Sequence, residues 1–277
     1  MKQLEHIAVG YNLHSQPGPL LEAIRLAVEV GAHLDVLYVA DKKEDPSRVQ
    51  AKVEQIVKTH CGDRSPAMTV HILTGKVPVA LGKFCSDGNT DLLVVGPRAT
   101  TLRERFLTGG PAAKLARFLD VPVLVAAEPS ARPFRRALVP VDFSAPASGA
   151  LQTAIDWLDG VEGAEIQVIH VFGKVGSTFR VDQGAQIGRL LTISTEELEH
   201  YVQSVDFRGI PYTVDVVAGV PSDEILRQAE EIDADLIVVG TVGRNWLGEA
   251  IIGSTTAKLI KRLRRPTLVV HPMGRTS

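Results

Sequence analysis

The sequence predicts an α/β fold made of two tandem doubly wound domains, each a five-stranded parallel sheet with helices on both faces. Short β-branched runs alternate with longer amphipathic stretches along the chain, as expected for parallel strands joined by helical crossovers. The chain of 277 residues also contains two similar halves. Its length suits two domains of ordinary size.

The repeat is visible in strand-like segments near the end of each half. Asp91-Leu-Leu-Val-Val-Gly96 recurs as Asp235-Leu-Ile-Val-Val-Gly240, 144 positions later. Val121-Pro-Val-Leu-Val125 recurs as Arg265-Pro-Thr-Leu-Val269 at the same offset. Such internal similarity predicts one structural unit used twice.

Near the start of each half the offset is smaller. Ala8-Val-Gly-Tyr-Asn12 recurs as Leu138-Val-Pro-Val-Asp142, 130 positions later. The second half therefore carries about a dozen extra residues, and we expect them as a loop at 172–188, which is rich in glycine and polar residues. The stretch 126–133, with two prolines, is the expected linker between domains at 1–129 and 134–277.

Each half is expected to run strand, helix, strand, helix, strand, helix, strand, helix, strand. In the first half the ranges are 5–11, 18–31, 34–40, 45–60, 68–73, 78–87, 91–95, 110–118 and 122–126. In the second half they are 136–141, 146–158, 164–171, 189–205, 211–217, 221–233, 235–239, 254–264 and 267–271.

Ligands of an open parallel sheet bind beyond the carboxyl ends of the strands. In the second half, three loops should converge there, at 140–144, 170–171 and 240–255. The first offers the Asp142 carboxylate, and the second offers backbone groups and an apolar wall. The third combines glycines with a helix start, and exposed N–H groups at a helix start bind anions. The three loops together predict a nucleotide pocket.

The chain resembles the universal stress protein family, in its tandem two-domain form, over nearly its whole length. The nucleotide motif of the family is Gly, two residues, Gly, nine residues, Gly and Ser or Thr. Gly240, Gly243, Gly253 and Ser254 match it. Val139-Pro-Val-Asp142 matches the end of the family's first strand, and His170-Val171 the end of its second.

The resemblance implies a strand order of 3-2-1-4-5, pairing of the halves through their last strands as an internal pseudo-dimer, and ATP binding, which some members of the family show. It also allows pairing of two copies of the chain. Asp142 and Ser254 could hold Mg²⁺ through the phosphates, since Mg²⁺ binds with few protein ligands. The expected ATP-binding residues are Pro140, Val141, Asp142, Val171, Val239, Gly240, Gly243, Arg244, Gly253, Ser254 and Thr255.

The first half departs from this motif. Asn12 stands at the position of Asp142, and Ala99 stands at the position of Gly243. Gly110-Pro111 replaces the Ser-Thr pair, so a hydroxyl and an N–H donor are lost. We therefore predict that the second half binds ATP and that the first half binds no nucleotide.

Each site residue also has a structural interpretation. Asp142 could cap a helix or form a turn, and Ser254 and Thr255 could cap the last helix. Gly240 and Gly243 could be turn glycines, and Arg244 an exposed loop cation. His170 is expected to pack at a strand end rather than bind a metal. Lys258 suits the end of its helix as well as a phosphate.

Composition excludes several other functions. A net charge of -2 and 5% aromatic residues give no basis for nucleic-acid binding. Two cysteines without metal-type spacing indicate reduced thiols, and the absence of a leader-like or membrane-spanning run indicates a cytoplasmic protein without a membrane span. The sequence shows no acid–base pair and no nucleophile beside a histidine, so it does not predict an efficient catalyst. Slow ATP hydrolysis or self-phosphorylation is the most that the family resemblance allows.

Two other functions stay open. The same fold could serve as a scaffold for unknown client proteins, using its sheet edges and the 172–188 segment without a nucleotide. It could also use ATP to activate a substrate with AMP, which would need a product other than ADP. The stress signal and the clients are not encoded in any recognisable motif.

Overall fold

The structure is a computed structural model. It describes residues 4–12, 16–40, 45–61, 65–97, 110–173, 183–241 and 252–271. Within these residues, none of the helices combines the length and the hydropathy that crossing a bilayer requires.

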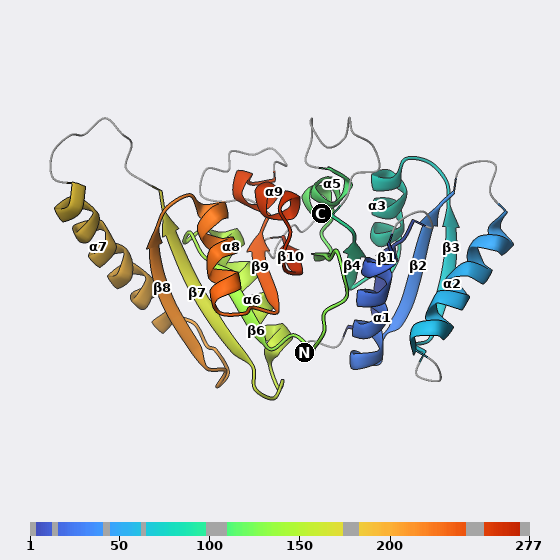
Figure 1. The fold of residues 1–277 in the computed structure, drawn as a ribbon, viewed down its shortest axis with the longest axis horizontal. Helices are drawn as coiled ribbons and strands as arrows, with labels where there is room; N and C mark the ends of the chain where they lie inside the picture. The colour runs from blue at the N-terminus through green and yellow to red at the C-terminus, as the bar shows by residue number, and fades with distance from the viewer. Residues whose placement is uncertain are drawn as a thin grey trace.

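Both halves alternate strands and helices, as predicted (Figure 1). The first half contains β1 (His6–Gly10), α1 (Gly18–Val30), β2 (His33–Val39), α2 (Pro46–Cys61), β3 (Met68–Leu73), α3 (Val77–Asp87), β4 (Leu92–Val95), α5 (Gly110–Phe118) and β5 (Val123–Val125). The second half contains β6 (Arg136–Pro140), α6 (Ala145–Leu158), β7 (Glu165–Phe172), α7 (Gln183–Gln203), β8 (Tyr212–Ala218), α8 (Pro221–Glu231), β9 (Leu236–Gly240), α9 (Ser254–Lys261) and β10 (Thr267–Val270).

The expected loop at 172–188 is wrong in part. Strand β7 continues to Phe172, and α7 already begins at Gln183, six residues before the predicted helix start. The backbone at 183–188 is therefore helical. The glycine and polar content that indicated a loop did not prevent a helix here, because propensity is only a weak guide to local structure.

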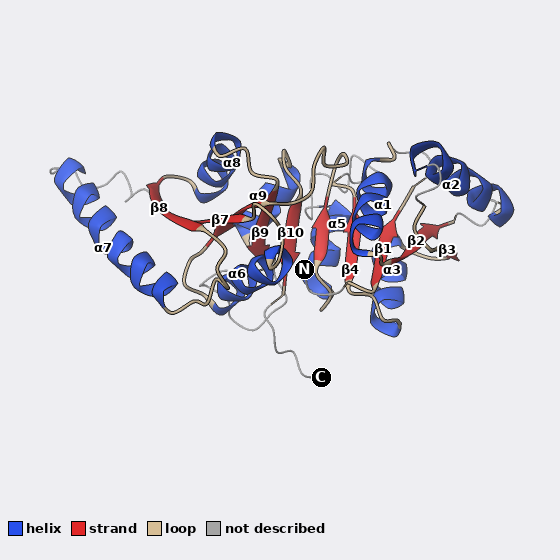
Figure 2. Cartoon of the chain, turned by 90° about the horizontal axis from the view of Figure 1, so that it is seen from below, coloured by secondary structure: helices blue, strands red, loops and turns tan. Residues whose placement is uncertain are grey.

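The strands in the described ranges form one sheet of ten, in the order β3-β2-β1-β4-β5-β10-β9-β6-β7-β8. Each half is parallel and has the order 3-2-1-4-5 in its own numbering. The halves meet through their last strands, where β10 runs antiparallel to β5 and Leu268 lies opposite Leu124. The internal pseudo-dimer is thus continuous at the level of the sheet, as Figures 1 and 2 show.

Helices cover both faces of the sheet (Figure 2). One core lies under α1, α2, α6 and α7, and the other under α3, α5, α8 and α9. Each core contains buried residues of both halves. Burial of apolar surface is the main driving force of folding, so the seam between the halves is stabilised on both faces of the sheet.

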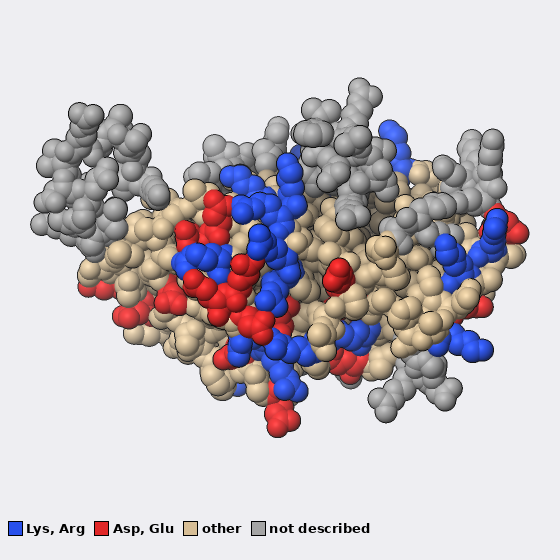
Figure 3. Space-filling view, viewed as in Figure 1, with Lys and Arg blue, Asp and Glu red and all other residues tan. Residues whose placement is uncertain are grey.

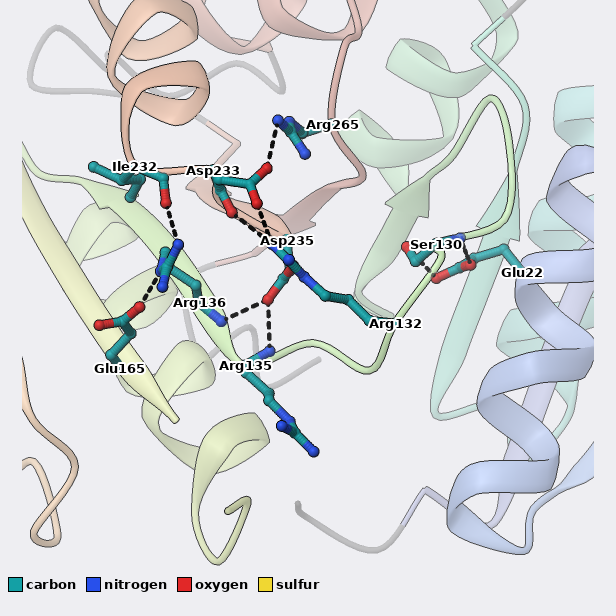
Figure 4. A network of polar contacts seen from close by, with 10 residues as sticks. All are labelled: Glu22, Ser130, Arg132, Arg135, Arg136, Glu165, Ile232, Asp233, Asp235 and Arg265. Carbon is teal, nitrogen blue, oxygen red and sulfur yellow. Dashed lines mark hydrogen bonds and ion pairs between the residues drawn. The ribbon is translucent and has the colours of Figure 1, made fainter. Parts of the chain in front are cut away.

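The connection at 126–135 joins the halves by side-chain contacts as well as by the chain itself (Figure 4). The Glu22 carboxylate of α1, fully buried, accepts hydrogen bonds from the backbone N–H of Ser130 at 2.6 Å and from its hydroxyl at 3.2 Å. Phe134 is buried between Arg25 of α1, whose guanidinium lies 4.7 Å from the ring centroid, and Trp157 of α6. The linker therefore fills the seam on this face.

The buried Asp235 forms hydrogen bonds with the other end of the linker. Its carboxylate accepts the backbone N–H groups of Arg135 and Arg136, at 3.1 and 2.9 Å, and the Nε–H of Arg132. Asp91 does the same in the first half, accepting the N–H groups of Glu5 and His6 at 2.8 and 2.9 Å. The aspartate that opens both repeated Asp-Leu segments therefore fixes the start of the first strand in each half.

Candidate functional site

The predicted site lies where β6, β7 and β9 end. Pro140 lies opposite Ile169 on β7, and Leu138 lies opposite Ile237 on β9. The residues that follow these strands therefore share the carboxyl edge of the second half. Among the expected ATP-binding residues, Val141 and Val239 are buried, whereas Pro140, Val171 and Gly240 are partly exposed.

Asp142 forms a turn at this edge. Its Oδ1 accepts hydrogen bonds from the backbone N–H of Ser144, at 3.2 Å, and from the Ser144 hydroxyl. The Ser144 hydroxyl oxygen in turn accepts the N–H of Ala147 and caps α6. Of the two structural interpretations of Asp142, the turn is confirmed and the helix cap is wrong, since Ser144 is the capping residue. This turn fixes the orientation of the Asp142 carboxylate.

His170 packs at the strand end, as predicted. It is buried, and its Nδ1 lies 2.8 Å from the Val141 carbonyl oxygen, so the imidazole donates to the backbone that precedes Asp142. Among the described residues no group of three or more His, Cys, Asp or Glu side chains has a geometry that would hold a metal ion.

Phe143 covers the His170 side of this edge. Its ring lies 4.8 Å from the His170 ring and 5.7 Å, edge-on, from the ring of Tyr201 on α7. Phe143 has a φ of 61°, a backbone conformation that is uncommon for a bulky residue. Such strain persists only where the surroundings hold it, and here the aromatic contacts of Phe143 do so.

Gly240 has a packing role that the sequence did not reveal. A Cβ at this position would lie 2.7 Å from the Pro146 carbonyl oxygen in the first turn of α6. The Gly240 carbonyl accepts a hydrogen bond from the buried Thr256 hydroxyl at 2.9 Å. Gly240 is thus needed for α6 to pack on the sheet, whether or not a ligand binds.

Helix α9 begins at the same edge, and its N-cap residue has no side chain that could cap it. Gly253 occupies the N-cap position, and no side chain there accepts a hydrogen bond from the first turn. Ser254 and Thr255 are the first two helical residues, so the interpretation that they cap the helix is wrong. Ser254 is exposed and Thr255 is partly exposed. Lys258 lies in the last turn, where a cation favours the helix dipole.

Two predicted site residues, Gly243 and Arg244, lie outside the described residues, as does the first-half position Ala99. In the first half, Gly96 repeats the packing of Gly240, since its Cβ would lie 3.2 Å from Cγ of Pro19 at the start of α1. The backbone of Ala127 also lies against Gly18 there, where an added Cβ would be 2.0 Å from the Ala127 carbonyl oxygen. The first residues of the linker therefore cover the start of α1.

Comparison with known proteins identifies the fold and the repeat. The family model described as the universal stress protein family matches residues 4–127 and again residues 133–271. The chain belongs to the universal stress protein family.

Similar universal stress proteins exist in single and tandem forms. The chain is 24% identical to one from Mycolicibacterium smegmatis over 272 residues, which cover 94% of this chain and 89% of the relative. It is 25% identical to one from Methanocaldococcus jannaschii over 154 residues, which cover 50% of this chain and 94% of the relative. The crystal structure of a universal stress protein from Archaeoglobus fulgidus has a TM-score of 0.68 at 22% identity and covers 99% of this chain and 98% of its own, so it shares the fold.

Three residues at the edge were not anticipated from the sequence, namely Pro146, Thr256 and Tyr201. The sequence marks only Pro146, because a proline is the second residue of the corresponding helix in each half, Pro19 in α1 and Pro146 in α6. Thr256 and Tyr201 have no counterpart that would mark them, and only the folded chain brings them to Gly240 and Phe143.

Proposed function

We propose that this universal stress protein is a regulatory ATP-binding protein whose second half, residues 134–277, holds the nucleotide and whose first half, residues 1–129, holds none. One observation supports this above the others. Helix α9 opens at the carboxyl edge with Gly253 at the N-cap, a residue without a side chain to cap the helix, next to the exposed Ser254. Uncapped N–H groups at a helix start are a ready anion site.

The remaining parts of the pocket follow from the strand ends. The triphosphate would lie on the start of α9 and on the loop that contains Gly243 and Arg244. The ribose would lie near the Asp142 carboxylate, which the Ser144 hydrogen bonds orient. The base would lie near Val141 and Val171 at the ends of β6 and β7. Mg²⁺ would bind through the phosphates, since it needs few protein ligands.

The proposal rests on these residues and on family membership. Another universal stress protein has been crystallised in complex with cAMP. That finding concerns the other protein, and it establishes only that nucleotides are ligands within the family. For this chain, the choice of ATP and of the second half comes from the motif that Gly240, Gly243, Gly253 and Ser254 form.

A thermal unfolding experiment with and without Mg-ATP tests the proposal. A ligand that binds only the folded state raises the unfolding midpoint. We expect a rise for the wild-type chain, no rise for Gly243→Val, and a wild-type rise for Ala99→Val, the matched substitution in the first half. An unchanged midpoint of the wild-type chain at saturating Mg-ATP would instead favour a scaffold that binds no nucleotide.

A further inference from the structure

Two strands at the ends of the sheet are left for contact with another chain. Strands β3 and β8 are the first and the last in the strand order, and each pairs with one neighbour among the described strands. They lie at opposite ends of the molecule (Figure 1). The last strand of each half, β5 or β10, is already paired across the seam. The outer edges of the sheet are therefore β3 and β8.

The hydrogen bonds of β8 show which of its backbone groups face away from the sheet. The Pro211 carbonyl accepts the N–H of Ile166 on β7 at 3.0 Å. In a parallel pair, alternate residues of a strand bond to the neighbouring strand, so the odd-numbered residues of β8 face β7. The even-numbered residues direct their N–H and C=O groups outward, and they are Tyr212, Val214, Val216 and Ala218.

Strand β3 has the same arrangement at the other end of the sheet. The Ala67 carbonyl accepts the N–H of Leu34 on β2 at 2.8 Å, so the odd-numbered residues of β3 face β2. Met68, Val70 and Ile72 therefore face outward. Neither β3 nor β8 contains a proline or a lysine, which are common protections of an edge strand. Both strands thus offer unpaired backbone groups to a further strand.

The two outer edges fit each other in the antiparallel direction. Strands of the first half run opposite to those of the second, so a copy placed beyond β8 in the same orientation pairs its β3 antiparallel with β8, as β5 pairs with β10 at the seam. In the register that sets Val216 opposite Val70, all three outward residues of β3 form hydrogen-bonded pairs with β8. Both valines pack on the core under α2 and α7. The same register sets Asp215 opposite His71, on the other face of the sheet.

The helices beside the two edges carry opposite charge. Helix α7 packs on β8, and its residues from Leu191 to Gln203 include three exposed glutamates and neither lysine nor arginine. Helix α2 packs on β3 and carries three exposed basic residues against one acidic residue. These residues are Glu196, Glu197 and Glu199 on α7, and Arg48, Lys52, Lys58 and Glu54 on α2. Since both helices cover the same face, pairing of β8 with β3 brings an acidic helix next to a basic one.

Pairing of β8 with the β8 of another copy is disfavoured by charge. The two-fold pairing that uses all four outward residues of β8 sets Asp215 opposite its own copy. Like charges directly opposite each other destabilise a sheet. This pairing also brings two acidic α7 helices together. The charges therefore favour β3 over β8 as the partner of β8.

We infer that copies of this chain associate head to tail, with β8 of one copy pairing antiparallel with β3 of the next. The inference is independent of nucleotide binding. Each contact uses one edge of each kind and leaves the other edge of each copy free, so association continues without closing at a dimer. Attraction between exposed charges is screened by salt, so association should weaken as the ionic strength rises.

Sedimentation of the full chain tests the inference, from about 10 µM to about 1 mM protein and at about 0.02 M and about 0.5 M salt. The mean mass of the wild-type protein should rise with concentration beyond that of a dimer, and it should rise less at the higher salt concentration. A mass that stays at that of one chain at every concentration would overturn the inference.

Two proline variants identify the surfaces. Val216→Pro blocks β8 and Val70→Pro blocks β3, and neither removes a hydrogen bond within the sheet, because both N–H groups face outward. Each variant alone should stay monomeric, since every contact needs both edges. An equimolar mixture should form dimers of one copy of each variant and nothing larger, because the intact β8 of one variant meets the intact β3 of the other. Association of either variant alone, or a mixture that stays monomeric, would contradict the pairing.

If the proline variants fail to fold, the charge at Asp215 decides. Asp215→Lys places a cation opposite His71 and beside the basic α2, and should weaken association about fivefold at the lower salt concentration. Asp215→Asn removes the charge without reversing it and should weaken association less. If Asp215→Lys associates as strongly as the wild-type protein, the inference is wrong.

Discussion

Gly240 and Pro146 are in direct contact, and a methyl group on Gly240 would come within 2.7 Å of the Pro146 carbonyl oxygen. Gly96 and Pro19 repeat this relationship in the first half, where nucleotide binding is not expected. The first glycine of the motif therefore serves packing in both halves. What distinguishes the second half must lie at positions that differ between the halves, such as Asp142, Gly243 and Ser254.

Gly240→Ala should destabilise the protein in the absence of any nucleotide. The new methyl group meets backbone atoms of α6, which cannot move without shifting the helix, and such overpacking costs about 1–3 kcal/mol. Gly96→Ala is the matched control and should cost less, because among the described residues its methyl group meets the ring of Pro19 alone, at 3.2 Å. Urea unfolding without ligand measures the loss of unfolding free energy in both variants. Wild-type stability of Gly240→Ala would show that the contact with Pro146 relaxes freely.

Asp142 should affect stability and binding separately. Asp142→Ala removes the acceptor of the Ser144 hydrogen bonds and should cost about 1 kcal/mol of unfolding free energy. Asp142→Asn keeps an acceptor oxygen and should recover most of that stability. Both variants should bind ATP more weakly than wild type. Urea unfolding and ATP titration on the same samples give the two numbers, and full ATP affinity in Asp142→Ala would remove this residue from the proposed pocket.

The hydrogen bonds that Asp235 accepts should stabilise the protein more than those that Asp91 accepts. Asp235→Ala removes a buried carboxylate that accepts two backbone N–H groups and the Nε–H of Arg132, and should cost about 2–3 kcal/mol, although the half-exposed Arg132 keeps its bonds to Asp233. Asp91 is exposed and accepts two N–H groups, so Asp91→Ala should cost about 1 kcal/mol. Equal losses in chemical unfolding would mean that the linker arginine adds nothing.

The surface ion pairs should contribute little by comparison. Arginines and acidic residues gather over α8 and α9, as Figure 3 shows, and include the pairs Arg227–Glu224, Arg262–Asp223 and Arg264–Glu230. Pairs this exposed are screened by salt and stabilise proteins by little. Each of these pairs joins one positive and one negative charge.

Cys85 should be chemically inert in the folded protein. Burial raises the pKa of its thiol to about 11, and the Asp35 charge adds to this effect while a hydrogen bond with Thr90 opposes it. Little thiolate is then present at about pH 8, and the thiolate is the reactive form. In a Cys61→Ser background, iodoacetamide should modify Cys85 at least about tenfold more slowly in native protein than in concentrated urea. Equal rates would show that the thiol is accessible.

The order of strands and helices could be predicted because each element carries its own pattern. The runs at 92–95 and 236–240 are apolar along their whole length, as expected for strands buried on both faces. The internal repeat then confirmed each element in a second copy. The seam through β5 and β10 was implied by family resemblance, since no local pattern in three- and four-residue strands specifies a partner.

The contacts that decide the candidate site could not be predicted in the same way. Nothing near Gly240 in the sequence indicates that Pro146 will lie against it, because they are 94 positions apart and the crossover of α6 brings them together. The same holds for Ser130 and Glu22, whose hydrogen bonds join the linker to α1. The early start of α7 at Gln183 could not be predicted, because the glycine and polar residues there indicated a loop and propensity is only a weak guide to local structure.

Isothermal titration of the full-length chain with Mg-ATP tests the central claim most directly, because it counts sites as well as measuring affinity. We predict one site per chain, lost in Gly243→Val and retained in Ala99→Val. Two sites of similar affinity, or a single site that survives Gly243→Val, would contradict the assignment of the nucleotide to the second half.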